Sequence, residues 1–536
     1  MNRIISIVTA VGAMFLLLPP FLVLAGRAMA QELAPVSLTT EVGSYEFAGK
    51  SYPADIGTLR VPEDRGNPES RSIELPLIKI HATGDNPAEP IFLLAGGPGD
   101  SNVDWRDPTP VGLLKHHDVV MVGYRAIDGS VSLDAPEVTE VYRTFAENPL
   151  SDENLQRLGQ AYFAAFQRLQ GEGIDMDSYT MIDVIDDFED ARVQLGYDQI
   201  NLYGRSYGTR VAYLYGLRYP DSLHRSALLA VNSPGHFVFE PDRIDAQLQY
   251  YAELWQRDAD AVARSPDIIA TMQTVLATLP QQWQGFRIDP DKVKVITHSQ
   301  LFHRADAVKV FDAYVAAENG DYAGLAFMSV AYDQIIPTLA NWGDRASKAL
   351  SADYDPDRDY LADMNPPGSI LGSPFSAELS VVGGIWPIQP IPQEYRTLRQ
   401  SEAETLLING NIDFSTPVEN ARELLPFLPS GKLVVLSEMG HTKDLTLRQP
   451  EALLHLLEIF YLTGEVDASR FKYDPMNFRP DKTFQQMARD FVAQASAPEA
   501  PAAKNVYQDS EGRFSMPLVG EWTRVETDGT FATLAY

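Results

Sequence analysis

The chain of 536 residues contains no cysteine. This absence excludes disulfide bonds, a thiol nucleophile and a thiolate metal site. If the protein is exported, the lack of disulfides fits a bacterial periplasm better than a eukaryotic secreted fold. Any covalent chemistry must therefore be carried by other side chains.

Positive charge is also scarce. The chain has 43 lysine and arginine residues against 73 aspartate and glutamate residues, which gives a formal net charge of -30. Such a charge repels nucleic acids and anionic membrane surfaces, so we expect neither as a partner. It weakly favours cationic ligands, or it only keeps an acidic surface soluble.

Motifs for metals and phosphates are missing as well. The sequence has no H-E-x-x-H or comparable ligand spacing. The glycine-rich run Gly96-Gly97-Pro98-Gly99 matches neither G-x-G-x-x-G nor G-x-x-x-x-G-K-[ST]. We therefore expect no metal and no cofactor.

Only one apolar run is long enough to enter a membrane, and it lies at the N-terminus. Arg3 precedes an apolar stretch that runs from Ile4 to about Gly26, and Ala28-Met29-Ala30 has the small-x-small form that signal peptidase cleaves. Residues 1–30 therefore predict a signal peptide and a periplasmic or secreted protein. An uncleaved anchor is the alternative, although Pro19-Pro20 interrupts the run. After cleavage no membrane span is expected.

Near-continuous apolar runs alternate with helical patterns, which predicts an α/β fold with a mostly parallel sheet. The expected strands are Ser72 to Ile80, Ile91 to Gly96, Asp118 to Arg125, Ile200 to Gly204, Ser226 to Val231, Thr405 to Gly410 and Lys432 to Met439. Between about His236 and Gln400 the strand pattern gives way to long helical stretches. A helical cap therefore interrupts the core.

These patterns predict six segments. They are a signal peptide (1–30), the first part of the core (31–235), a helical cap insertion (236–400), the second part of the core (401–492), an Ala/Pro-rich linker (493–505) and a short β segment of unknown role (506–536).

The sequence Gly204-Arg205-Ser206-Tyr207-Gly208 matches G-x-S-x-G, the nucleophile elbow. It follows an apolar strand and opens a helix, which is the context that the motif requires. A serine in this strained turn brings the residues two before and two after it into close contact, so Gly204 and Gly208 satisfy a steric need. Ser206 is the candidate nucleophile.

A serine nucleophile needs a base and an acid that orients it, here expected in the chain order Ser, Asp or Glu, His. His441 follows the strand "KLVVLSEM" directly, whereas His455 lies inside an apolar helix pattern. Asp413 follows the preceding strand and is the candidate acid. Glu419, Glu438 and Asp444 are alternatives.

Acyl chemistry also needs donors for an oxyanion. The glycines after the strand Ile91 to Gly96 allow backbone N–H groups to approach a substrate oxygen. Gly97 and Tyr207 are the candidate donors, and a plain tight turn at Gly96 to Gly99 is the alternative.

Four of these motifs, in this order, resemble α/β-hydrolases of the serine aminopeptidase family, which includes proline iminopeptidases and tripeptidyl aminopeptidases. They are "GGPGDS", "LGYDQINLYGRSYGTRVAYLYGLRYPD", "LLINGNIDFSTPVENA" and "MGH". Ala95 stands where proline iminopeptidases usually carry histidine, which is closer to the tripeptidyl type. The stretch "GYRAIDGS" keeps Arg125 and Ser130 of the family's D-x-R-G-x-G-x-S, but Gly123 and Ala126 replace Asp and Gly.

The resemblance implies an α/β-hydrolase fold and release of residues from the free N-terminus of a peptide, with cap carboxylates that bind the substrate amine. The cap offers four acidic residues near aromatic ones: Glu253, Glu318, Asp321 and Asp333. The expected function is an exported aminopeptidase that forms an acyl-enzyme on Ser206. A carboxylesterase or another acyl hydrolase with the same residues is the first alternative, and a non-catalytic binding protein is the second.

Overall fold

The computed structural model describes residues 36–496 and the short segments 505–508, 515–518, 523–525 and 533–535. The expected signal peptide and residues 497–504 of the expected linker lie outside the described residues. None of the described helices is long and apolar enough to cross a membrane. In the C-terminal region, β12 (Asn505–Gln508) pairs with β13 (Ser515–Leu518), and β14 (Thr523–Val525) pairs with β15 (Thr533–Ala535).

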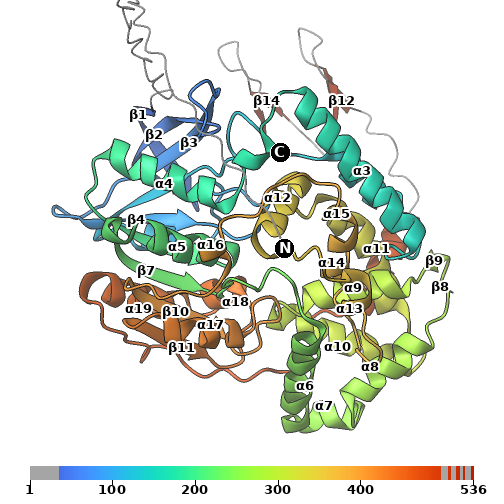
Figure 1. The fold of residues 1–536 in the computed structure, drawn as a ribbon. Coiled ribbons are helices and arrows are strands. Elements are labelled where there is room, and N and C mark those ends of the chain that lie inside the picture. Colours follow the sequence, from blue (N-terminus) through green and yellow to red (C-terminus); the bar gives the residue numbers. More distant parts are fainter. Residues whose placement is uncertain (1–35, 497–504, 509–514, 519–522, 526–532, 536) are drawn as a thin grey trace, which may run out of the picture.

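A nine-stranded sheet, drawn on the left of Figure 1, forms the centre of one half of the protein. In chain order its strands are β1 (Ser37–Phe47), β2 (Lys50–Pro62), β3 (Ser72–Ile80), β4 (Ala88–Leu94), β5 (His117–Val122), β6 (Ile200–Arg205), β7 (Leu223–Leu229), β10 (Glu404–Gly410) and β11 (Gly431–Leu436). Their order in space is β1-β2-β3-β5-β4-β6-β7-β10-β11. The pairs from β1 to β5 are antiparallel and those from β5 to β11 are parallel. The predicted α/β class with a mostly parallel sheet is confirmed.

All seven predicted strands are present, with ends that differ by a few residues. The central strands β4 to β7 and β10 are buried along most of their length, which explains their continuous apolar sequences. The hairpin of β1 and β2 was not predicted. Nearly every residue of β1 is exposed or half-buried, so the strand carries no clear apolar alternation.

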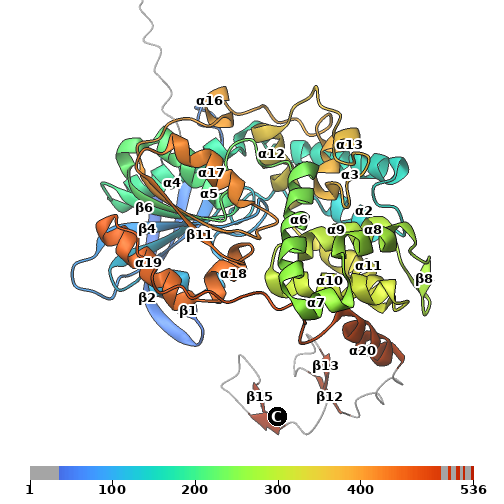
Figure 2. The ribbon, with the colours of Figure 1, turned by 90° about the horizontal axis from the view of Figure 1, so that it is seen from below.

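Helices cover both faces of this sheet. Figure 2 shows α4 (Met181–Leu195), α5 (Tyr207–Arg218) and α17 (Val418–Leu424) on one face and α19 (Pro450–Thr463) on the other. Helix α4 begins with a capping box between Thr180 and Asp183 and ends at Gly196, whose φ is 76°. These helices and the sheet bury one large apolar cluster.

A second half consists almost entirely of helices, on the right of Figure 1. Between β7 and β10 the helices are α6 (Pro241–Arg257), α7 (Ala259–Arg264), α8 (Ile268–Ala277), α9 (Pro290–Gln300), α10 (Arg304–Glu318), α11 (Ala323–Ile335), α12 (Trp342–Asp353), α13 (Tyr360–Asp363), α14 (Pro374–Ala377), α15 (Leu379–Val382) and α16 (Gln393–Arg396). The two-residue strands β8 (Gln282–Trp283) and β9 (Phe286–Arg287) pair within it. We call this half the cap.

Packing divides the chain differently from the sequence boundaries. Helices α2 (Pro136–Arg143) and α3 (Asp152–Gly171), expected in the core, contribute to the apolar cluster of the cap. Helix α20 (Phe484–Ser496), placed mostly in the second part of the core, packs on α11, where the Phe484 ring stacks on Phe327. It also includes the first four residues of the expected linker. Each of these helices has an apolar face that the cap covers.

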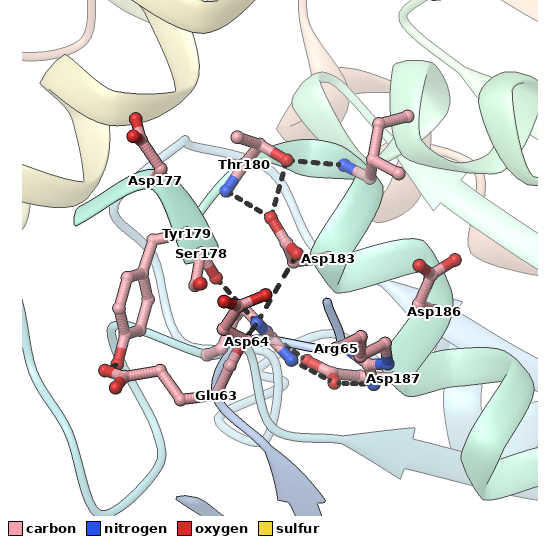
Figure 3. Close-up of polar contacts among 12 residues, drawn as sticks. Glu63, Asp64, Arg65, Asp177, Ser178, Tyr179, Thr180, Asp183, Asp186 and Asp187 are labelled. Carbon is pink, nitrogen blue, oxygen red and sulfur yellow. Dashed lines mark hydrogen bonds and ion pairs between the residues drawn. The ribbon is translucent and has the colours of Figure 1, made fainter. Parts of the chain in front are cut away.

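A buried arginine fixes the loop after β5. The Arg125 side chain is fully buried, and its Nε and Nη2 each lie 2.6 Å from a carboxylate oxygen of Asp187 on α4. Arg65 also binds Asp187 at 2.6 Å, and Tyr179 donates to the carboxylate of Glu63 (Figure 3). Burial alone would raise the pKa of Asp187, but the two arginines outweigh it and lower the pKa. Arg125, which the chain shares with the family motif, therefore joins the sheet to α4.

The cap contains one buried histidine without polar partners. His298 on α9 is fully buried, and neither of its ring nitrogens has a hydrogen-bond partner among the described residues. Phenylalanine rings surround it at centroid distances of 5.1–5.6 Å, namely Phe239, Phe302, Phe375 and Phe414. Burial lowers the pKa of His298 to about 3. The neutral ring therefore behaves as part of an aromatic cluster.

We predict that His298 weakens the fold in acid. Its pKa is about 3 in the folded chain against an ordinary 6.5, so between these pH values the unfolded chain binds more protons. The free energy of unfolding then falls as the pH drops, by about 2 kcal/mol from pH 7.5 to pH 5 for this one group. Urea unfolding of the wild type and of His298→Leu should give a smaller acid loss in the variant. Parallel pH curves would contradict this.

Candidate active site

Ser206 lies at the junction of β6 and α5 with a strained backbone. Its φ of 50° and ψ of -121° lie in a region that residues with a side chain rarely adopt. Its backbone N–H donates to the Leu229 carbonyl at 2.9 Å, which ties the turn to β7. A strained serine held by its surroundings is typical of a nucleophile elbow.

The glycines on either side make this turn possible. A Cβ on Gly204 would lie 2.7 Å from the Gly208 carbonyl oxygen. A Cβ on Gly208 would overlap the Leu94 carbonyl oxygen and lie 2.6 Å from that of Ala95. Real Cβ atoms do not approach backbone oxygens this closely, so both positions require glycine.

Asp413 and His441 are brought together at the ends of β10 and β11. His441 Nδ1 lies 2.9 Å from Asp413 Oδ2 and 3.1 Å from Oδ1. The Asp413 side chain is fully buried, and it accepts from the Ser415 N–H, the Thr416 N–H and the Thr416 hydroxyl at 2.8–2.9 Å. Every carboxylate oxygen therefore has a partner, which holds the group ready to orient the imidazole.

The other acids and the other histidine have different partners. Asp444 accepts from the backbone N–H groups of Gly440 and Arg304, and Glu438 accepts from the Tyr473 hydroxyl and the Met476 N–H. Glu419 is exposed and pairs with Arg422. His455 binds Asp467 at 2.8 Å. Asp444 and Glu438 thus support the histidine loop without touching the imidazole.

The candidate oxyanion donors face Ser206 from two elements. Tyr207 is the first residue of α5, where backbone N–H groups lack an acceptor within the helix. Gly97, with a φ of 110°, lies in the loop after β4, and both residues line the same cavity as Ser206. A buried asparagine holds this loop, since Asn102 Oδ1 accepts from the Ala95 N–H at 2.7 Å and its Nδ2 donates to Leu93 and Val122 carbonyls. Sequence reasoning did not single out Asn102.

Gly123 and Ala126 lie in a loop that Asp128 holds. Asp128 Oδ2 accepts from the backbone N–H groups of Tyr124 and Asn102 at 2.8 and 2.9 Å. A Cβ on Gly123 would lie 2.7 Å from the Asp128 Cβ and from the Pro76 ring, so this position requires glycine. Ala126 has a φ of 77°, a conformation that glycine adopts more easily, and nothing in the structure explains the alanine there.

One cavity of about 690 Å³ contains Ser206, His441, Gly97 and Tyr207 along its wall. Its volume suits a small molecule or a short peptide segment. Among the described contacts there is no hydrogen bond between Ser206 and His441; such bonds are often long before substrate binds. His303 also lines the cavity, with its ring centroid 6.3 Å from that of His441. Burial, and after it the charge of His441, lowers the pKa of His303 to about 4.

The cap acids suggested by the resemblance do not line this cavity. Glu253 faces Arg257, Glu318 binds Thr271, Asp321 pairs with Arg489 and Asp333 pairs with Lys292. The cap carboxylate that lines the cavity is Glu378, directly before α15. No local sequence pattern indicates Glu378, because only the packing of the cap brings it to the cavity wall.

Three carboxylates besides the exposed Asp104 line the cavity: Glu378 and Asp107 are buried, Asp107 binds Arg205, and Asp100 is exposed. Glu378 accepts from the Tyr142 hydroxyl and pairs with Arg345 at 2.8 Å. Burial would lower the pKa of Arg345, but Glu378 outweighs it and raises the pKa. Asp100 follows Gly99 in the loop after β4 and is exposed at the cavity. Either Glu378 or Asp100 offers acceptors to a cationic group.

The cap forms hydrogen bonds with the loop that carries Asp413 and with the loop that carries His441. The His441 N–H donates to the Phe302 carbonyl at 2.7 Å, and the Gln247 side chain donates to the Asp413 carbonyl at 2.9 Å. Arg304 donates to the Glu438 carbonyl, just before the histidine loop. The cap therefore takes part in positioning the site.

The chain is similar to several known proteins. The family described as alpha/beta hydrolase fold matches residues 89–442. The tripeptidyl aminopeptidases of Streptomyces lividans and Streptomyces coelicolor are each 23% identical over 458 residues; the match covers 78% of this chain and 83% and 82% of theirs. A solved serine hydrolase from Cycloclasticus zankles is 12% identical, covers 77% of this chain and all of its own, and gives a TM-score of 0.35.

We predict that Gly208→Ala damages the site through the backbone. The new methyl group would overlap the carbonyl oxygens at the end of β4, so the variant should lose about 2–3 kcal/mol of unfolding free energy or shift the elbow. The matched control is Gly171→Ala at the end of α3, where a Cβ meets nothing within 4 Å. Thermal unfolding of both should show a clear loss for Gly208→Ala and none for Gly171→Ala. Equal melting temperatures would contradict the steric argument.

Proposed function

The chain belongs to the α/β-hydrolase fold family, and we propose that it is an exported serine aminopeptidase that releases a fragment from the free N-terminus of peptides. The observation that carries this proposal is the buried Asp413–His441 pair on the wall of the cavity that contains the strained Ser206. The tripeptidyl aminopeptidases that match most of the chain support a peptide substrate. Export rests on the signal-like sequence of residues 1–30.

In the proposed mechanism His441 takes the proton from the Ser206 hydroxyl as the oxygen attacks the scissile carbonyl. Asp413 holds Nδ1 of the imidazole and stabilises the imidazolium that forms. The backbone N–H groups of Gly97 and Tyr207 bind the oxyanion. His441 then gives the proton to the leaving amine, and a water molecule, deprotonated by His441, hydrolyses the ester on Ser206.

Glu378 and Asp100 imply different fragment lengths. Asp100 is in the same loop as Gly97, so an ammonium group bound there would lie one residue from the scissile bond. Glu378 belongs to the cap, and a longer fragment would reach it. We assign the substrate amine to Glu378, because the relatives are tripeptidyl enzymes and because two of its roughly four acceptor positions are still open.

The first test compares a peptide anilide that has a free amine with its N-acetylated form, alongside a p-nitrophenyl ester. We expect the free-amine peptide to be cleaved and the acetylated one to resist, because acetylation removes the charge that a carboxylate binds. A fluorophosphonate probe should label the wild type and leave Ser206→Ala unlabelled. Ester turnover with both peptides intact would make the protein an esterase. Absence of labelling and turnover would favour a binding protein.

A second test removes the charge of Glu378. Glu378→Gln should reduce the preference for the free-amine peptide over the ester about tenfold, the effect of about 1.4 kcal/mol, because an amide does not pair with an ammonium group. Glu253→Gln is the matched control, since Glu253 lies on the exposed face of α6. Mass spectrometry of the released fragment gives its length. An unchanged preference in Glu378→Gln would move the amine to Asp100.

A further inference from the structure

Apolar side chains are exposed at the mouth of the active-site cavity. Among the described residues eleven large apolar side chains are exposed, and three of them line this cavity: Ile335 and Leu339 at 39% and Leu447 at 47%. In contrast, Tyr162, Glu378 and Val382 on the same cavity wall are buried. The exposed residues therefore mark the entrance and the buried ones the closed end.

The chemistry of the site decides which part of a substrate lies at each end. A fragment of fixed length fits the closed end, whereas the rest of the peptide, which has no fixed length, must extend into solvent through the entrance. His441 gives its proton to the leaving amine, so the leaving segment begins on the histidine side. Helix α18 (Thr442–Leu447) starts directly after His441 and ends at Leu447. The leaving segment thus starts beside α18.

We propose that Leu447, Leu339 and Ile335 form a binding subsite for the leaving segment of the peptide, selective for an apolar side chain directly after the scissile bond. Leu447 comes from the histidine side, and Ile335 and Leu339 come from the cap, at the end of α11 and just after it. Exposed apolar groups that line the same cavity favour an apolar partner, because contact removes both surfaces from water. This inference rests on the proposed aminopeptidase function.

A charged residue at the entrance would favour an acidic side chain after the scissile bond instead of an apolar one. This residue is Lys443 on α18, which is exposed and lines the cavity. Asp104 and Arg106 are also exposed and line the cavity, and they bind each other. An exposed lysine contributes little through solvent-screened attraction. Burial of a leucine side chain contributes more, so the apolar preference should win.

The test uses peptides that share one N-terminal fragment and differ in residue X, placed directly after the bond that the wild-type protein cleaves. We expect kcat/KM for X = Leu to exceed that for X = Asp about tenfold. The double variant Leu339→Gln/Leu447→Gln should lower this ratio at least about fivefold. Leu462→Gln on α19, a leucine of similar exposure (41%) that does not line the cavity, is the matched control and should keep the wild-type ratio.

The possible outcomes separate the inference from the proposed function. If the wild type cleaves the peptides but handles X = Asp as well as X = Leu, the subsite is overturned and the aminopeptidase stands. The same follows if the ratio persists in the folded double variant. If no peptide is cleaved, the proposed function fails and the subsite fails with it. A wild-type ratio near one overturns the subsite whether or not the double variant folds.

Discussion

The protein depends on one backbone constraint, the turn that holds Ser206 at a positive φ. This turn needs a strand that ends directly before Ser206, a helix that begins directly after it, and glycine at positions 204 and 208. The burial of β6 and α5 in the apolar cluster supplies the stability that offsets the strain. The loops after β4, β10 and β11 begin at the same edge of the sheet as this turn, because these strands are parallel to β6.

The cap shares in this arrangement. Its packing unites helices from three separate parts of the sequence, because α2, α3 and α20 join those between β7 and β10. The carbonyl of Phe302 and the side chain of Gln247 hold the histidine and acid loops from the cap side. Glu378, Arg345 and aromatic side chains of the cap line the cavity. We therefore expect substrate recognition to depend on the packed cap.

Sequence reasoning found the parts of the structure that local patterns encode. The buried parallel strands are continuous apolar runs, so the strands could be predicted. Ser206, Asp413 and His441 each follow the end of a strand, so these candidate site residues could be predicted as well. The exposed β1 lacks such a pattern. The membership of α2, α3 and α20 in the cap, and the place of Glu378 on the cavity wall, depend on contacts between distant segments that no local pattern contains. The hydrogen bonds from Asp128 that hold the loop of Gly123 also depend on the folded chain and have no local sequence signal.

The hydrogen bond from the His441 N–H to the Phe302 carbonyl has a mechanical consequence. A cap that lifted at this edge would release the histidine loop, so we expect the Asp413–His441 pair to keep its geometry only while the cap is seated there. If Ser206 acts as proposed, substrate must then enter by threading through a fixed aperture. The protein would then act on flexible N-termini, and a folded protein whose N-terminus is packed against its own surface would not be a substrate.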